Sequence, residues 1–173
     1  MKGSEEDYIY DDDQTYTFSQ DNSFWWATGV DQPGAYSLIS LESGDCTIYI
    51  PKVEEFRKYW EKILELDEYT TLFQIAGAKY LTELETDISK ADTVYILGGG
   101  VNKYSDVGPL APEFDWMFKY NINNTALYPC INEVKLKKSE DEILLLKEAA
   151  RIGSEAHVFV LQNVKAGVNE SHI

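Results

Sequence analysis

Few residues in this 173-residue chain have the types and spacing that metal-dependent hydrolysis needs. A two-metal hydrolase needs several carboxylates, and usually a histidine, that converge on the ions and on a metal-bound water. The only histidines are His157 and His172, and neither has a histidine or cysteine partner at a spacing typical of metal ligands. The run Asp11-Asp12-Asp13 lacks the alternating order and the terminal glutamate of a calcium loop. We therefore expect a solvated turn at this run, and no catalytic or metal-binding residue.

The glycine triplet Gly98-Gly99-Gly100 follows a β-rich run and is a candidate phosphate loop. It lacks both the lysine-hydroxyl pair of a P-loop and the GxGxxG spacing of a dinucleotide site. A tight exit from a strand, which glycine permits, is the favoured interpretation, and a ligand or nucleotide loop is the alternative. Ser37 and Ser40 lie in a strand pattern without the GxSxG elbow of a serine nucleophile.

Composition excludes several classes of function. The 30 acidic residues outnumber the 15 basic ones, and a formal net charge of −15 argues against nucleic-acid binding. No run reaches the roughly 18 consecutive apolar residues of a membrane span, and the acidic start does not resemble a signal peptide. Cys46 and Cys130 are far apart in the sequence, which favours free thiols in a reducing compartment. We expect a cytoplasmic protein with no membrane or nucleic-acid partner.

The elements that would position these residues alternate between strand-like and helix-like periods, which predicts an α/β fold with helices covering a sheet. Two β-rich segments bracket the turn sequence Glu42-Ser43-Gly44-Asp45 and predict a hairpin over Ala35 to Ile50. Pro51 would end the second strand. Apolar residues then recur at helical spacing and predict a helix over Val53 to Leu64, with Trp60 on its apolar face.

Similar patterns continue along the rest of the chain. They predict a helix over Ala78 to Ile88, a strand buried on both faces over Thr93 to Leu97, and a helix over Pro112 to Tyr120. Ser139-Glu140-Asp141-Glu142 is a capping box that opens a long helix ending near Gly167. The apolar stripe of this helix is wide, which is typical of a helix covered on more than one side.

The segment FSQDNSFWWATGVDQPGAY, Phe18 to Tyr36, closely resembles the RQ(E/D)SxFxWxxGVxEPGxY segment of Xaa-Pro dipeptidases (prolidases). These are metallopeptidases of the aminopeptidase P superfamily that cut dipeptides ending in proline. Further motifs follow in the family's order, so the resemblance covers essentially the whole chain and favours the dipeptidase branch. They are Thr47-Ile48-Tyr49-Ile50-Pro51 with Trp60 after it, Gly100-Val101-Asn102, Asn123-Asn124-Thr125 with Pro129 after it, and Ser154-Glu155-Ala156-His157.

The resemblance implies a creatinase/prolidase-type N-terminal domain, which is a three-layer α/β fold with a mixed sheet flanked by helices. It assigns residues 1–138 to that domain, with the family's first helix and first strand missing. Residues 139–173 would be a linker and the first helix of the catalytic domain. In the family, that following domain holds two Mn ions on two Asp, one His and two Glu side chains. We expect no cofactor in this chain.

The resemblance also implies a non-catalytic role in dimerisation and in restricting access to the active site. The partners would be the chain's own catalytic domain and a second copy, and we expect the isolated chain to dimerise. The helical spacing of Trp60 favours a core tryptophan; as the alternative, Trp60 resembles a family tryptophan that reaches the active-site mouth of the partner subunit. The alternative function is a stand-alone interaction or small-ligand-binding module derived from such a domain.

Overall fold

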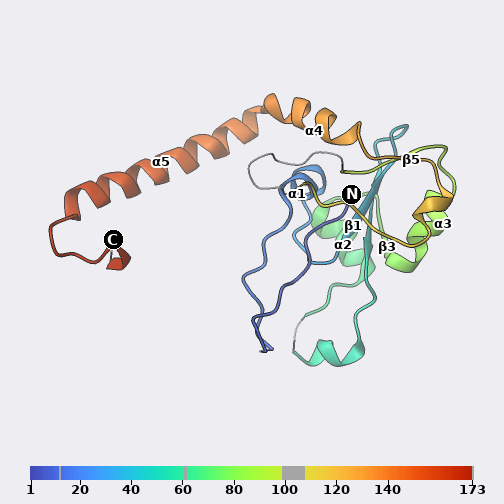
Figure 1. The fold of residues 1–173 in the computed structure, drawn as a ribbon, viewed down its shortest axis with the longest axis horizontal. Coiled ribbons are helices and arrows are strands. Elements are labelled where there is room, and N and C mark those ends of the chain that lie inside the picture. The colour runs from blue at the N-terminus through green and yellow to red at the C-terminus, as the bar shows by residue number, and fades with distance from the viewer. Residues whose placement is uncertain (12, 61, 99–107, 173) are drawn as a thin grey trace. The chain divides into compact units, whose positions relative to one another are not determined.

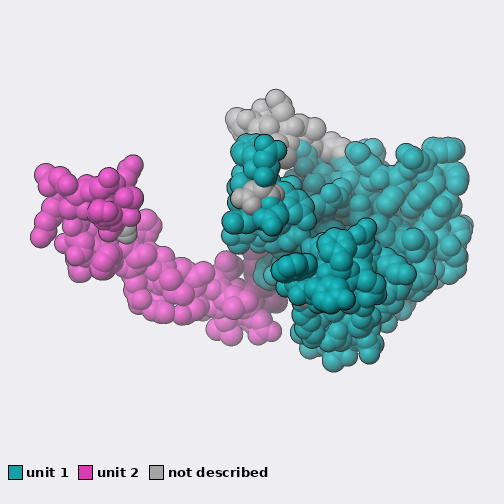
Figure 2. Space-filling model, turned by 90° about the horizontal axis from the view of Figure 1, so that it is seen from below, with its two compact units in different colours: residues 1–131 teal, residues 132–173 magenta. Residues whose placement is uncertain are grey.

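The computed structural model describes residues 1–11, 13–60, 62–98 and 108–172. The chain divides into two compact units, Met1–Ile131 and Asn132–Ile173, which Figure 2 shows in teal and magenta. The first unit contains the sheets and the shorter helices. The second unit consists mainly of one long helix.

A three-stranded mixed sheet forms the centre of the first unit (Figure 1). Strand β2 (Cys46–Ile50) lies between β1 (Tyr36–Ile39), to which it is antiparallel, and β3 (Gly77–Tyr80), to which it is parallel. The predicted hairpin is confirmed, with Tyr36 opposite Tyr49 and Ile39 opposite Cys46. Gly44 has a φ of 78° in the connecting turn, a conformation that costs glycine little.

Helices cover both faces of this sheet, which gives the expected three layers (Figure 1). On one face, Ile48 and Ile50 pack with residues of α1 (Asn22–Thr28) and α2 (Leu66–Phe73). On the other face, Tyr49 packs with α3 (Leu84–Ile88) and with Val94. Alternate residues of β2 therefore enter two separate cores, as the period of a strand requires. The predicted α/β class is confirmed.

Helix α1 is short and is fixed at both ends. Asp21 accepts hydrogen bonds from the backbone N–H groups of Ser23 and Phe24, at 3.0 and 2.8 Å, and so caps its N-terminus. Gly29, with a φ of 70°, ends the helix and donates to the Trp25 carbonyl. These caps place Phe24 in the core while Trp25 remains exposed.

The first residues of the chain pair with the outer edge of β1. The Gly3 N–H donates to the Ala35 carbonyl, and the Ser37 N–H donates to the Met1 carbonyl, at 2.8 and 2.9 Å. Residues 5–11 and 13–18 then form an irregular two-stranded segment, the N-terminal ribbon, in which Tyr8 lies opposite Thr15. The residues just before the ribbon thus attach it to the edge of the sheet.

The helix predicted over Val53 to Leu64 is wrong. A short 3-10 helix, η1 (Glu55–Tyr59), stands there after the extended residue Glu54, and the next α-helix begins only at Leu66. Its N-cap residue, Glu54, makes no side-chain capping bond, and several residues in the segment are β-branched or aromatic and favour helix only weakly. Burial of an apolar face is what normally stabilises such a helix, and η1 contains no buried residue.

The helix predicted over Ala78 to Ile88 is confirmed only in its second half. Ala78 to Tyr80 belong to β3, because they pair with Ile48 to Ile50 of β2. A 3-10 turn, η2 (Leu81–Glu83), then leads into α3. Long-range strand pairing has overridden the helical periodicity here.

The two predictions around the second sheet are correct only in part. The strand predicted over Thr93 to Leu97 is β4 (Val94–Tyr95), parallel to β5 (Ile122–Asn123); Val94 is buried but Tyr95 is 40% exposed. The helix predicted over Pro112 to Tyr120 is reduced to a 3-10 turn, η3 (Met117–Lys119). Aromatic packing shapes this segment instead. The ring centroid of Phe114 lies 5.2 Å from that of Tyr36 and 4.8 Å from that of Trp116.

Two further helices end the chain, α4 (Leu127–Leu136) and α5 (Glu140–Asn163), before a terminal 3-10 turn, η4 (Glu170–His172). The capping box of α5 is confirmed, because the Glu142 N–H donates to Ser139 Oγ and the Ser139 N–H donates to the Glu142 carboxylate. No residue of α5 is buried, and large apolar side chains such as Leu145, Ile152 and Phe159 are exposed. Among the described residues, no helix is both long and apolar enough to cross a membrane.

Candidate functional site

The residues that the sequence offered as possible ligands are solvent-exposed wherever the structure describes them. His157 and His172 are exposed in the second unit, and Asp11 and Asp13 are exposed in the N-terminal ribbon. Within the part of the chain that the structure describes, no three His, Cys, Asp or Glu side chains are grouped as metal ligands. Cys46 and Cys130 are free thiols. Most of the glycine triplet, Gly99 and Gly100, lies outside the described residues, as do Asp12 and the Gly100-Val101-Asn102 motif.

The aromatic side chains of η1 are the clearest surface feature at a position that the sequence singled out. We call Phe56, Tyr59 and Trp60 the aromatic tip; they are 56%, 87% and 86% exposed. Strand β2 ends in three buried residues, but Pro51 follows it directly and cannot extend a hydrogen-bonded ladder. The chain therefore leaves the sheet and turns back only at α2. The core interpretation of Trp60 is wrong, and its role at an active-site mouth stays a prediction.

Backbone hydrogen bonds and ion pairs hold the aromatic tip. The Arg57 N–H donates to the Glu54 carbonyl and the Trp60 N–H to the Arg57 carbonyl, each at 3.0 Å. Lys58 Nζ lies 3.3 Å from the Glu55 carboxylate and 3.6 Å from that of Glu65, and these carboxylates, Glu55 first, raise the Lys58 pKa. The tip is thus a defined turn that presents apolar rings to solvent.

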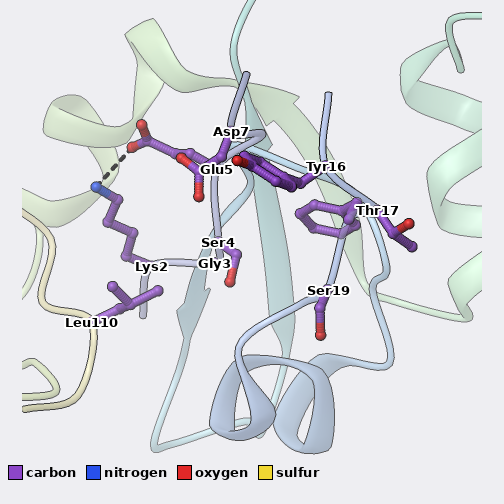
Figure 3. A pocket seen from close by; sticks show the side chains of 10 residues that line it. Lys2, Gly3, Ser4, Glu5, Asp7, Tyr16, Thr17, Ser19 and Leu110 are labelled. Carbon is purple, nitrogen blue, oxygen red and sulfur yellow. Dashed lines mark ion pairs between the residues drawn. The ribbon is translucent and has the colours of Figure 1, made fainter. Parts of the chain in front are cut away.

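A separate pocket of about 420 Å³ lies where the N-terminal ribbon leaves the sheet edge (Figure 3). Its walls are residues 2–5 and 16–19, with Asp7 and Leu110. Lys2 Nζ lies 2.7 Å from the Glu5 carboxylate, and this hydrogen bond raises the Lys2 pKa. The cation of the pocket is therefore already paired with one of its own carboxylates.

A larger groove of about 730 Å³ is lined by β1 and by residues of the second sheet; we call it the β1 groove. Its volume lies within the range of small-molecule sites, about 300–1,000 Å³. Ser37 is 5% exposed, and among the described residues its hydroxyl is the buried side-chain polar atom without a hydrogen-bond partner. The apolar walls include Leu38, Ile39, Ile88, Val94, Phe114 and Trp116.

A hydrogen-bonded ionic cluster ties β2, β3 and α3 together at one side of this groove. The Tyr49 hydroxyl donates to Asp87 Oδ2 at 2.7 Å, and Lys79 and Lys90 lie 2.5 and 2.6 Å from the same carboxylate. Lys79, then Lys90 and Tyr49, hold the Asp87 pKa well below its usual range. Burial, then the bond to Asp87, raises the Tyr49 pKa.

Sequence reasoning missed this cluster, because no local motif joins its members. Tyr49, Lys79 and Asp87 come together only through the parallel pairing of β2 with β3 and the return of α3 over the sheet. Lys79 and Lys90 share the one Asp87 carboxylate, whose side chain is only 13% exposed. It stabilises the three-layer arrangement.

Comparison with known proteins identifies the class of domain. The family model "Aminopeptidase P, N-terminal domain" matches residues 1–95, which is more than half of the chain. The chain therefore belongs to the aminopeptidase P N-terminal domain family, as its motifs predicted.

Relatives and solved structures agree with this assignment. Xaa-Pro dipeptidase from Homo sapiens is 32% identical over 98% of this chain, and that match spans 35% of the human protein. Aminopeptidase P from Escherichia coli, solved zinc-substituted with product, has a TM-score of 0.73 at 19% identity and covers 99% of this chain and 42% of its own. Proline aminopeptidase P II from Yersinia pestis has a TM-score of 0.75 at 18% identity. The chain spans about a third of the curated relatives it matches.

Proposed function

We propose that this chain is the non-catalytic N-terminal domain of an Xaa-Pro dipeptidase-type metallopeptidase. The observation that carries the proposal is the continuous match, at 32% identity, to about a third of an Xaa-Pro dipeptidase. In this proposal the hydrolytic chemistry belongs to a catalytic domain that holds two Mn ions and follows this one. The chain's own role would be to support a cytoplasmic homodimer and to restrict access to the active site.

The exposed aromatic tip supports the second part of the proposal. Trp60 is 86% exposed, so most of its apolar ring surface faces water. Monomeric proteins rarely leave apolar clusters uncovered without a partner. At the mouth of the partner subunit's active site, the flat indole of Trp60 could close over a proline ring and exclude water. Exclusion of water would strengthen the electrostatic interactions of a metal site.

The wide apolar stripe of α5 supports the assignment of residues 139–173 as the start of the catalytic domain. Its large apolar side chains, including Leu144, Leu145 and Leu161, are 62%, 71% and 76% exposed. Packing against the rest of a catalytic domain would bury them, and their burial would provide much of the free energy of docking.

The proposal is tested on two proteins, this chain and a longer polypeptide that adds the catalytic domain. We expect Gly-Pro hydrolysis with added Mn²⁺ from the longer polypeptide and none from this chain. In the longer polypeptide, Trp60→Ala should lower kcat/KM for dipeptides about tenfold with little change in Tm. Leu41→Ala is the matched control, because Leu41 is also exposed, at 80%, but lies in the β1–β2 turn. Turnover of Gly-Pro by pure preparations of this chain alone would refute the proposal.

The β1 groove favours a second candidate function, that of a stand-alone small-ligand-binding module. The groove has mainly apolar walls and a volume in the small-molecule range, a combination typical of sites for small apolar molecules. The dye anilinonaphthalene sulfonate is a suitable probe. Saturable one-to-one binding that persists when a catalytic domain is attached would favour this function, and loss of binding in the longer polypeptide would exclude it.

A further inference from the structure

The ion pair between Arg57 and Glu6 joins residues much farther apart in the sequence than the other ion pairs around the aromatic tip do. Arg57 Nη2 lies 3.3 Å from Glu6 Oε2, and the two residues are 51 positions apart. Among the described residues, no other ion pair joins more distant parts of the sequence. Lys58, by contrast, pairs with Glu55 and Glu65, which lie in the same excursion of the chain between β2 and α2.

Both ends of this pair are attached to ordered backbone. On the Glu6 side, the Gly34 N–H donates to the Ser4 carbonyl at 2.8 Å, and the Tyr16 N–H donates to the Asp7 carbonyl at 2.9 Å. Glu6 therefore lies between Ser4, which is bonded to the chain just before β1, and Asp7, which is bonded across the N-terminal ribbon. On the other side of the pair, the Arg57 carbonyl accepts the hydrogen bond from the Trp60 N–H.

The environment of the pair also favours a positioning role. The Glu6 and Arg57 side chains are only 26% and 38% exposed, whereas the rings of Tyr59 and Trp60 are almost fully exposed. A turn without buried residues has little packing to fix its position, so a link to the ribbon restricts it disproportionately.

We propose that Arg57 is a positioning residue for the aromatic tip: its ion pair with Glu6 fixes η1 against the N-terminal ribbon and so fixes where Trp60 stands. The consequence for catalysis rests on the proposed role of Trp60 at the active-site mouth. The positioning itself does not, and it can be measured on this chain alone.

The first experiment is millisecond hydrogen–deuterium exchange of residues 55–60 in this chain. Arg57→Gln and Glu6→Gln should each speed exchange by up to about fivefold, the effect expected for a partly exposed ion pair. The double variant should be no faster than either single one, and the charge exchange Glu6→Arg with Arg57→Glu should restore protection. Lys58→Gln is the matched control within η1, because Lys58 pairs with Glu55 and Glu65 and not with the ribbon. Hydrogen exchange of the ribbon should be the same in this variant as in the wild type. Exchange that is unchanged in both single variants would overturn the inference.

The second experiment uses the longer polypeptide with its catalytic domain. Arg57→Gln should raise KM for dipeptides severalfold with kcat nearly unchanged, and the charge exchange should restore KM. A merely structural role would instead lower Tm and would not produce this split between KM and kcat. If Trp60→Ala has no effect on kcat/KM, the proposed function fails, but the exchange measurement still decides whether Arg57 positions the tip.

Discussion

Tyr49 and the aromatic tip follow one another along the chain, yet they lie in opposite environments. Tyr49, within β2, is 1% exposed, and its hydroxyl is bonded to Asp87 between two lysines. Trp60, beyond Pro51, is 86% exposed and belongs to an element without buried residues. The comparison teaches that aromatic content alone does not identify the core. A large ring stabilises the fold only where the sheet provides a covered face, and elsewhere it is available to a partner.

The largest expected effect lies in the core beneath the sheet. Phe24 is fully buried, so Phe24→Ala should lower the free energy of unfolding of the chain by about 3–5 kcal/mol. Trp25→Ala is the matched control, because Trp25 is the next residue of α1 and is 55% exposed. Urea unfolding followed by circular dichroism measures both. Equal losses for the two variants would mean that α1 does not present Phe24 to the core as described.

The Asp87 cluster should have the next largest effect. Asp87→Asn keeps the shape but removes the charge that Lys79, Lys90 and Tyr49 share, and should cost about 1–3 kcal/mol. Because the folded-state pKa of Asp87 is lowered, its stabilisation is present above the ordinary carboxyl pKa of about 4 and is lost as the pH falls below it.

The pH dependence of this cluster is measured by urea unfolding between pH 3 and pH 7. The difference in stability between the wild type and Asp87→Asn should shrink as the pH falls. Asp45→Asn, in the exposed β1–β2 turn, is the control and should follow the wild type. A difference that stays constant across this range would show that Asp87 is not the group whose ionisation stabilises the sheet.

A smaller effect is expected at the start of α5. Ser139→Ala removes the side-chain half of the capping box and should cost about 1 kcal/mol, because the Glu142 N–H loses its acceptor. Hydrogen exchange of the first turn of α5 measures this locally. Ser154→Ala is the control, because Ser154 Oγ donates to the Ala150 carbonyl in mid-helix and caps nothing. Comparable changes in both variants would contradict the capping role.

The smallest effect on stability should come from the aromatic tip. Trp60→Ala in this chain should change the free energy of unfolding by no more than about 0.5 kcal/mol, because the ring makes little contact with the core. Urea unfolding measures this change, and the loss in the Phe24→Ala variant is the reference for a buried ring. A loss of several kcal/mol would show that Trp60 is a core residue and would remove the physical basis for its proposed role.

Local signals in the sequence predicted the parts of the fold that depend on neighbouring residues. The hairpin followed from alternating residues around Gly44, and the start of α5 followed from the Ser139 capping box. Parallel pairing of β3 with β2 has no such signal, and the helical spacing of Ala78 to Tyr80 was therefore misleading. The helix over Val53 to Leu64 failed for a related reason, since periodicity cannot show whether a surface exists to cover an apolar face.

The candidate site was predictable only in part, and for the same reasons. The family motif after β2 singled out Trp60, but its exposure depends on how the chain leaves the sheet at Pro51. The pair of Arg57 with Glu6 could not be predicted, because an ion pair between residues so far apart requires the ribbon to lie beside η1.

The central claim, that the aromatic tip acts on the active site of a second subunit, is tested by mixed dimers of the longer polypeptide. One subunit carries Trp60→Ala with an intact catalytic domain, and the other carries the native Trp60 with a catalytic domain inactivated at its metal site. Dipeptide hydrolysis is then measured per intact active site. We predict a kcat/KM near that of the wild type in this mixed dimer, because Trp60 is supplied by the inactive subunit. A kcat/KM as low as that of the Trp60→Ala homodimer would contradict the account.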